Sequence, residues 1–221
     1  SHAVENINLL EDKEVKDFVG EYNPQEYLLN QEHSMAVGPY DIPAYYMEHK
    51  KQQATAMENA KQVILDVAAE FEKISGRKYG LFETYKLDDA ECAIVIINSA
   101  AGTAKDAVDK LRAEGKKVGL LKIRVFRPFP AKEIAEALKN VKVLAVMDRC
   151  EGFSSQGGPL GAEVKSALYT AGSTAKVVDY IYGIGGRDVR VENIEEVYGA
   201  LFDILATGNV GETYRYLSLR D

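Results

Sequence analysis

The stretch from residue 118 to residue 130 constrains the fold of this chain more than any other part. Residues 118–125 form a near-continuous run of aliphatic and β-branched residues, which is typical of a strand covered on both faces in a parallel sheet. Arg124 and Arg127 follow where the strand ends, and Pro128 and Pro130 prevent it from continuing. Ligands and partners usually bind an open α/β sheet at this carboxyl edge, so the sequence predicts a functional surface there.

Strand and helix signals alternate through residues 87–207, which favours a mostly parallel α/β sheet of about five strands. The predicted strands are residues 92–97, 118–125, 143–147 and 176–182, with a short edge strand at 189–191. The predicted helices are residues 103–114, 131–139 and 160–171, followed by a last helix. Thr103 is expected to cap the first helix, and Asn193 with Glu196 to start the last one. Residues 208–221 are expected to be a tail that docks elsewhere.

The first 86 residues differ from this domain. Residues 1–43 show little periodicity and are rich in turn residues, so they are interpreted as an extended arm or inter-domain connector. Residues 44–86 hold a long helix that ends before Gly76, and then a short strand or linker. The helix carries an apolar stripe that predicts core or interface packing: Met57, Ala60, Ile64, Val67, Ala68 and Phe71.

Three tyrosines in this first part leave two readings open. Tyr40, Tyr45 and Tyr46 are able to stack on a base or sugar, but half-buried contacts between domains are the favoured interpretation. The start of the chain, Ser1-His2, is either native or a cloning remnant. An arm without a core of its own suggests a fragment of a longer protein.

Composition excludes several classes. The 221 residues carry a net charge of −7, which argues against nucleic acid or an anionic membrane as partner. No apolar stretch is long enough to span a bilayer and the chain begins without a signal-peptide core, so a cytoplasmic location is predicted. Cys92 and Cys150 form no CxxC pair, which argues against a disulfide, an iron–sulfur cluster or a structural zinc site. Cys150 is expected to be a small packing residue rather than an exposed thiol.

Two glycine-rich loops are candidate sites at the predicted carboxyl edge. Gly157 and Gly158 precede a helix, where backbone amides suit a phosphate or carboxylate. The same glycines equally suit close approach of another subunit's backbone. The second loop contains Gly186, Arg187 and Asp188. A third turn, residues 98–103, lacks both GxGxxG and the P-loop lysine, so it is interpreted as a tight turn into a capped helix.

Charged residues share that edge. Arg124, Arg127, Arg149 and Arg187 are able to bind an anionic ligand together or to meet acidic residues of a neighbouring chain, and the spacing leaves both open. Asp148 is expected to pair with Arg149 locally or to act across an interface. No catalytic residue is predicted, because the three histidines lie in the arm or long helix and no Ser or Cys sits in a nucleophile elbow.

Several motifs in order along the chain resemble the α chain of 2-oxoacid:ferredoxin oxidoreductases, most closely pyruvate:ferredoxin oxidoreductase, also called pyruvate synthase. The main one is Arg-Pro-Phe-Pro at residues 127–130, after Lys-Val-Gly-Leu-Leu-Lys-Ile-Arg. The others are Asp-Asp-Ala-Glu at 88–91, Gly-Thr-Ala-Lys at 102–105, Asp-Arg at 148–149, Gly-Gly-Pro-Leu at 157–160 and Gly-Gly-Arg-Asp at 185–188. The resemblance covers essentially the whole chain and matches the later part of that α chain, without its first, thiamine-diphosphate-associated domain.

The resemblance implies a fold similar to the transketolase C-terminal domain. It also implies an anaerobic enzyme that oxidatively decarboxylates a 2-oxoacid to an acyl-CoA and reduces ferredoxin. Thiamine diphosphate, Mg²⁺, iron–sulfur clusters and CoA belong to the whole enzyme, with none bound by this chain alone. The implied partners are β, γ and δ portions of the same enzyme, and ferredoxin through that complex.

By the same resemblance, this chain is expected to be a structural and assembly domain that is inactive by itself. Two alternatives remain open from the residues: a nucleotide- or CoA-binding α/β module, and a stand-alone interaction domain.

Overall fold

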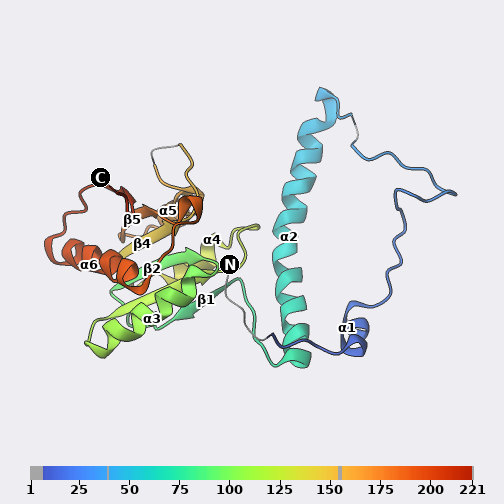
Figure 1. Cartoon of the computed structure of the whole chain (residues 1–221). Coiled ribbons are helices and arrows are strands. Elements are labelled where there is room, and N and C mark those ends of the chain that lie inside the picture. Colours follow the sequence, from blue (N-terminus) through green and yellow to red (C-terminus); the bar gives the residue numbers. More distant parts are fainter. Residues whose placement is uncertain (1–6, 39, 154–155, 221) are drawn as a thin grey trace. The chain divides into compact units, whose positions relative to one another are not determined.

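The structure is a computed structural model that describes residues 7–38, 40–153 and 156–220. It divides the chain into two compact units, Ser1–Tyr79 and Gly80–Asp221 (Figure 1). Ser1 and His2 lie outside the described residues.

The first unit contains two helices, α1 (Asp12–Val19) and α2 (Pro43–Ser75). Helix α2 confirms the predicted long helix; it starts with a proline and ends at Gly76, which takes a left-handed φ of 68°. Helix α1 lies in the arm that the sequence predicts to be irregular, and the Glu11 amide donates to Glu14 at its start. The Phe18 and Phe71 rings lie 5.9 Å apart, so α1 packs near the end of α2. Over their described lengths neither helix has a buried residue.

The second unit is a sheet with helices on both faces, as predicted. Its six strands within the described residues have the order β1-β3-β2-β4-β5-β6, and only β1 is antiparallel to its neighbour. The strands are β1 (Phe82–Tyr85), β2 (Cys92–Ile97), β3 (Val118–Ile123), β4 (Val143–Asp148), β5 (Lys176–Ile181) and β6 (Tyr214–Tyr216). The helices are α3 (Ala100–Ala113), α4 (Ala131–Ala137), α5 (Pro159–Thr170) and α6 (Val191–Thr207), with the short 3₁₀ helix η1 (Ile184–Gly186).

Each central strand contributes side chains to two hydrophobic cores, one on each face of the sheet. In β2, Cys92, Ile94 and Ile96 face a core formed with α3 and α6, whereas Ala93 and Val95 face a second core formed with α4 and α5 (Figure 1). This alternation explains the uninterrupted apolar runs in the sequence, because both faces of these strands are covered.

Several boundaries differ from the sequence-based prediction; β3, for example, ends at Ile123 rather than at residue 125. Thr103 does not cap α3; the helix begins at Ala100 after Ser99, because Asn98 takes a left-handed φ of 72° and turns the chain directly out of β2. Asn193 lies in the first turn of α6 rather than at its cap, and its Oδ1 accepts from the Arg190 amide at 3.0 Å. Residues 189–191 form no strand but lead into α6.

The expected tail contributes to the sheet. Strand β6 pairs in parallel with β5, and the Asp179 amide donates to Thr213 O at 2.8 Å. This gives six strands in the described chain where the sequence predicts about five. Three residues are too short a run to show strand periodicity, and only the pairing with β5 makes them a strand.

We predict that Gly119→Ala in β3 lowers the free energy of unfolding by about 1–3 kcal/mol. A Cβ at this position would lie 2.6 Å from Lys86 O and 2.8 Å from Leu87 Cα, both backbone atoms that have no rotamer with which to move away. Urea unfolding of the full chain measures the loss. Gly102→Ala is the matched control, because a Cβ there meets nothing within 4 Å and α3 favours alanine. Equal stability of the two variants would contradict the proposed close approach.

Candidate functional site

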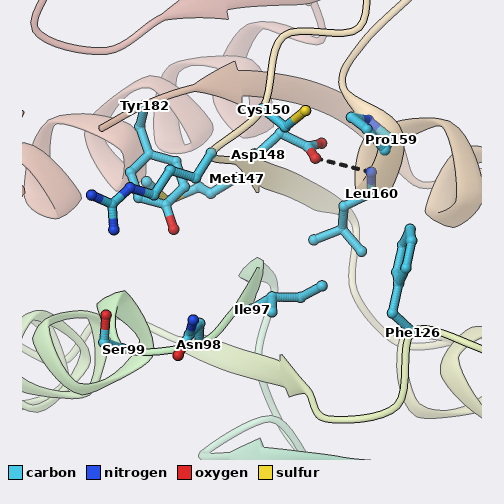
Figure 2. A pocket seen from close by; sticks show the side chains of 11 residues that line it. Ile97, Asn98, Ser99, Phe126, Met147, Asp148, Cys150, Pro159, Leu160 and Tyr182 are labelled. Atoms are coloured by element: carbon cyan, nitrogen blue, oxygen red, sulfur yellow. Dashed lines mark hydrogen bonds between the residues drawn. The ribbon is translucent and has the colours of Figure 1, made fainter. Parts of the chain in front are cut away.

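A pocket of about 310 Å³ opens at the carboxyl edge of the sheet, where β2 and β4 end side by side (Figure 2). The chain leaves β2 toward β3 on one side and later returns to β4 on the other side. This position is therefore the topological switch point, at which open α/β sheets bind their ligands. The pocket lies where the sequence predicts a functional surface.

Apolar side chains form most of the pocket wall. Figure 2 shows Ile97 at the end of β2 opposite Met147 in β4, with Leu160 of α5 and Phe126 beside them. The polar lining residues are Asn98, Ser99, Asp148, Arg149 and Cys150. A small apolar group with one or two polar ends would suit such a lining.

Asp148, the last residue of β4, caps the N-terminus of helix α5. Its carboxylate, only 5% exposed, accepts from the Leu160 amide at 2.9 Å and from the Gly161 amide at 2.8 Å. Helix α5 needs this help because its N-cap residue, Gly158, has no side chain. The predicted local pair with Arg149 does not form in the described chain, where Arg149 Nε donates instead to Gly183 O at 3.1 Å.

A second carboxylate, which the sequence analysis misses, lies beside Asp148. Asp179 in β5 is fully buried, and one of its oxygens accepts from the Gly158 amide at 2.6 Å. Burial, and then the charge of Asp148, raise the pKa of Asp179 to about 7. Burial also raises the pKa of Asp148, against the lowering effect of its two amide donors. The signal in the sequence is an aspartate in the middle of an otherwise apolar strand, Val-Val-Asp-Tyr-Ile.

The two carboxylates account for the glycines of the first candidate loop. A Cβ on Gly157 would lie 2.1 Å from Asp179 Oδ2, and one on Gly158 would lie 2.3 Å from Asp148 Cγ. Gly161, which the sequence analysis does not single out, would place a Cβ 2.1 Å from Asp179 Oδ2. The close approach is therefore to carboxylates of the same chain. Ser154 and Ser155 of this loop lie outside the described residues.

The four arginines are not gathered around one position. Arg124 pairs with Glu83 at 2.7 Å, and Arg127 pairs with Glu163 at 2.6 Å while its guanidinium covers the Phe126 ring.

Of the other two arginines, Arg149 donates to Gly183 O, and Arg187 donates to Ser218 O. Beside Arg187, the Asp188 carboxylate accepts from the Val189 amide at 3.0 Å. Gly186 is the last residue of η1, with a φ of 82°.

Several other expectations can be compared with the structure. The turn at residues 98–103 is a tight turn into a helix, in which the Ala101 and Gly102 amides donate to Asn98 O and Ser99 O. Cys150 is exposed, because it follows the end of β4 at the pocket rim, so the expected packing role is wrong. Within this chain Tyr40 is 90% exposed and the neighbouring Tyr45 and Tyr46 are also exposed, so their contact with another domain stays a prediction.

The carboxylate and the thiol that line the pocket both contact the backbone of the chain. Among its described lining residues, the one carboxylate is occupied by helix amides and the one thiol contacts a backbone carbonyl at 3.7 Å. No histidine lines it to activate that thiol. Fold and site together define a class of protein: a mostly parallel α/β domain with a mostly apolar pocket at its switch point.

Comparison with family models identifies the particular family. Residues 90–194 match the model described as pyruvate:ferredoxin oxidoreductase core domain II. Residues 1–69 match the model described as pyruvate flavodoxin/ferredoxin oxidoreductase, thiamine diphosphate-binding. The chain belongs to the family of 2-oxoacid:ferredoxin oxidoreductase α chains, as the sequence motifs predict.

Curated relatives agree over the full length of the chain. The chain is 44% identical to pyruvate synthase subunit PorA of Thermotoga maritima, over 100% of this chain and 55% of the relative. It is 38% identical to ketoisovalerate oxidoreductase subunit VorA of Pyrococcus horikoshii, over 100% of this chain and 56% of the relative. The chain thus spans about half the length of these relatives.

Two solved structures are similar at lower levels. One is 2-oxoglutarate:ferredoxin oxidoreductase from Magnetococcus marinus, with a TM-score of 0.48 and 20% identity over 73% of this chain and 24% of that chain. The other is a split-gene transketolase, with a TM-score of 0.41 and 16% identity over 62% of this chain and 45% of that chain. Within the described residues, no helix combines the length and the hydropathy that crossing a membrane requires.

We predict that Asp179→Asn changes how stability depends on pH. The pKa of Asp179 is about 7 in the folded chain and about 3.9 in an unfolded one. The folded chain therefore holds a proton that the unfolded chain releases, and stability falls as the pH rises from about 4 to about 7. Asparagine keeps an acceptor for the Gly158 amide but has no proton to lose.

Urea unfolding at pH 5 and pH 8 measures this effect. The free energy of unfolding of the parent chain should fall between these pH values by roughly 1–3 kcal/mol more than that of Asp179→Asn. Asp203→Asn, at an exposed position in α6, serves as the control and should follow the parent. The same pH dependence in Asp179→Asn and the parent would show that Asp179 does not titrate in this range.

Proposed function

We propose that this chain is a structural and assembly portion of a 2-oxoacid:ferredoxin oxidoreductase α chain. The whole enzyme would convert a 2-oxoacid and CoA to an acyl-CoA and CO₂, and pass the electrons to ferredoxin. The family membership supports this reaction class, and the relatives named for pyruvate and for ketoisovalerate support a 2-oxoacid as substrate. The higher identity to the pyruvate synthase subunit makes pyruvate the first substrate to test.

One observation carries the assembly role: the first unit leaves its apolar side chains uncovered. Helix α2 has 33 residues, and none of them is buried. Met57 and Val67 of the predicted stripe are 44% and 47% exposed. The other large exposed apolar residues of the described first unit include Ile7, Leu9, Val19, Tyr22, Leu28, Leu29, Val37, Tyr40, Met47 and Val63. Many exposed large apolar side chains in one unit are typical of a segment that another polypeptide covers.

The cofactors of the whole enzyme are assigned by the family rather than by this chain. Thiamine diphosphate with Mg²⁺, iron–sulfur clusters and CoA would be bound mainly by other portions. The match of residues 1–69 to a thiamine diphosphate-binding family model supports a place for the first unit next to that cofactor. The two cysteines of the sequence are too few to hold an iron–sulfur cluster.

The partners would be the β, γ and δ portions of the same enzyme, with ferredoxin reached through the complex. The names of the relatives, which are subunits, support this assignment. The complex would act in the cytoplasm. The domain division that fits this role takes the arm and long helix as the assembly part and the α/β domain, including β6, as its scaffold.

The first test is activity. We predict that the isolated chain, supplied with thiamine diphosphate, Mg²⁺, CoA and pyruvate under anaerobic conditions, does not reduce methyl viologen. The complex purified from the source organism with an antibody against this chain should contain iron and reduce viologen with CoA and one 2-oxoacid. Turnover by the isolated chain would overturn the proposed structural role. A single polypeptide without iron or activity would overturn the assignment to an oxidoreductase complex.

The second test addresses the uncovered stripe of α2. We predict that Met57→Glu with Val67→Glu, introduced into the full-length α chain, prevents its co-elution with the other subunits in size-exclusion chromatography. Charges placed in an apolar interface are costly to desolvate, whereas α2 itself should stay helical because neither position is buried. Ala69→Glu, at an exposed position on another side of the helix, is the control and should assemble normally. Normal assembly of the double variant would exclude the stripe as an interface.

A further inference from the structure

A second, polar pocket lies away from the switch point, between η1, the start of α6 and the end of the described chain. Its volume is about 630 Å³, and Gly185, Gly186, Arg187, Arg190, Ser218 and Arg220 line it. We propose that this pocket binds the phosphate groups of a small phosphorylated ligand, of the diphosphate or phosphate-ester class. The proposal does not depend on the proposed enzymatic function.

The charge of the pocket favours an anion. Among its described lining residues, three carry guanidinium groups and one, Asp188, carries a carboxylate. The chain as a whole carries a net charge of −7, so this is a local reversal of sign. Glu192 lies in the first turn of α6 but does not line the pocket.

Two of the three guanidinium groups, those of Arg190 and Arg220, are less engaged than the guanidinium groups of Arg112 and Arg127. Arg112 and Arg127 approach their carboxylate partners to 2.7 and 2.6 Å. In contrast, Arg190 Nε is 3.8 Å from Asp188 Oδ2, with both side chains more than three-quarters exposed, and such a pair contributes little. The structure records no ion pair for Arg220 within the described residues. Donors that are not satisfied by the chain are available to a ligand.

Neighbouring contacts hold the pocket in shape. Arg187 Nη1 donates to Ser218 O, and Asn193 Nδ2 donates to Ser218 Oγ at 3.0 Å. Asn193 Oδ1 also accepts from the Arg190 amide, so one side chain links the start of α6 to the end of the described chain. The Ser218 hydroxyl, which accepts from Asn193, keeps its own proton to donate. A ligand would therefore meet an ordered set of donors.

The backbone around this pocket also favours a negatively charged ligand. Gly185 and Gly186 have φ values of 69° and 82°, and a Cβ on either would meet nothing within 4 Å. These glycines are thus required by the turn and not by packing, and they leave the backbone open toward the pocket. The 17-residue helix α6 begins at Val191, and its N-terminus carries a partial positive charge that favours anions.

Several guanidinium groups around one volume indicate more than one anionic group in the ligand. Guanidinium forks bind phosphate oxygens in pairs of parallel hydrogen bonds, which makes arginine the residue that suits phosphates best. The pocket at the switch point differs, because its lining is mostly apolar. The two pockets therefore suit different chemistry, and the phosphate assignment applies to the polar one.

Isothermal titration calorimetry of the full chain with inorganic pyrophosphate, at low salt and without divalent cations, tests the proposal. We expect saturable binding of one pyrophosphate per chain that weakens as NaCl is raised. Arg190→Gln and Arg220→Gln should each weaken binding about tenfold, since each removes charge-assisted hydrogen bonds. Lys117→Gln, which removes the same charge just before β3 at the amino edge of the sheet, should bind like the parent.

Circular dichroism checks that each variant is folded, and we expect Arg190→Gln to fold because the Arg190 side chain is mostly exposed. Absence of saturable binding, or equal affinity of the parent and both arginine variants, would overturn the proposal. Hexaglutamate serves as a competitor. If it bound more tightly than pyrophosphate, the pocket would recognise acidic segments of a protein partner, and the phosphate assignment would be wrong.

Discussion

The pair of buried carboxylates at the end of β4 and in the middle of β5 is the constraint on which the carboxyl edge depends. Asp148 and Asp179 accept hydrogen bonds from three backbone amides at the start of α5, with N···O distances of 2.6–2.9 Å. These bonds give α5 the cap that its own sequence lacks, and they hold Leu160 in the wall of the switch-point pocket. The same carboxylates occupy the space of three Cβ atoms, so the glycines at 157, 158 and 161 follow from them. The loop that contains Gly157 and Gly158 resembles a ligand-binding nest, but its glycines are required by contacts with Asp148 and Asp179 of the same chain.

The two units of the chain satisfy the hydrophobic effect in different ways. In the α/β unit, the strands bury both faces beneath α3 and α6 on one side and α4 and α5 on the other. In the first unit, helices α1 and α2 carry large apolar side chains but bury none of their residues. A segment of this kind gains its stability from what it contacts, which is the physical basis for an assembly role. The match of residues 1–69 and residues 90–194 to two different models of one family is consistent with this division of labour.

The bounds of strands and helices were predictable to within a few residues where burial leaves a clear pattern of apolar residues in the sequence. The strands at 92–97 and 143–148 are apolar except for the final Asp148, the strand at 176–181 is mostly apolar, and α2 shows both its stripe and its terminal glycine. Helix starts were less predictable, because Thr103 and Asn193 are good capping residues that the chain does not use as caps. The start of α3 depends on the left-handed turn at Asn98, and β6 depends on pairing with β5. Both are decided by the strands nearby rather than by local preference.

In the candidate site, too, local sequence motifs were predictable, whereas contacts between residues far apart in the chain were not. The sequence by itself determined the alternation of strands and helices, the arginines near the carboxyl edge, the two glycine-rich loops and the family, because each is written in consecutive residues. Only the tertiary structure decided which groups meet. In the folded chain, Asp148 of β4 lies beside Asp179 of the neighbouring strand β5. Each of the four arginines has a partner of its own: Arg124, Arg127, Arg149 and Arg187. The reason is that a hydrogen bond or an ion pair depends on distances between residues far apart in the chain, which burial patterns along the sequence do not record.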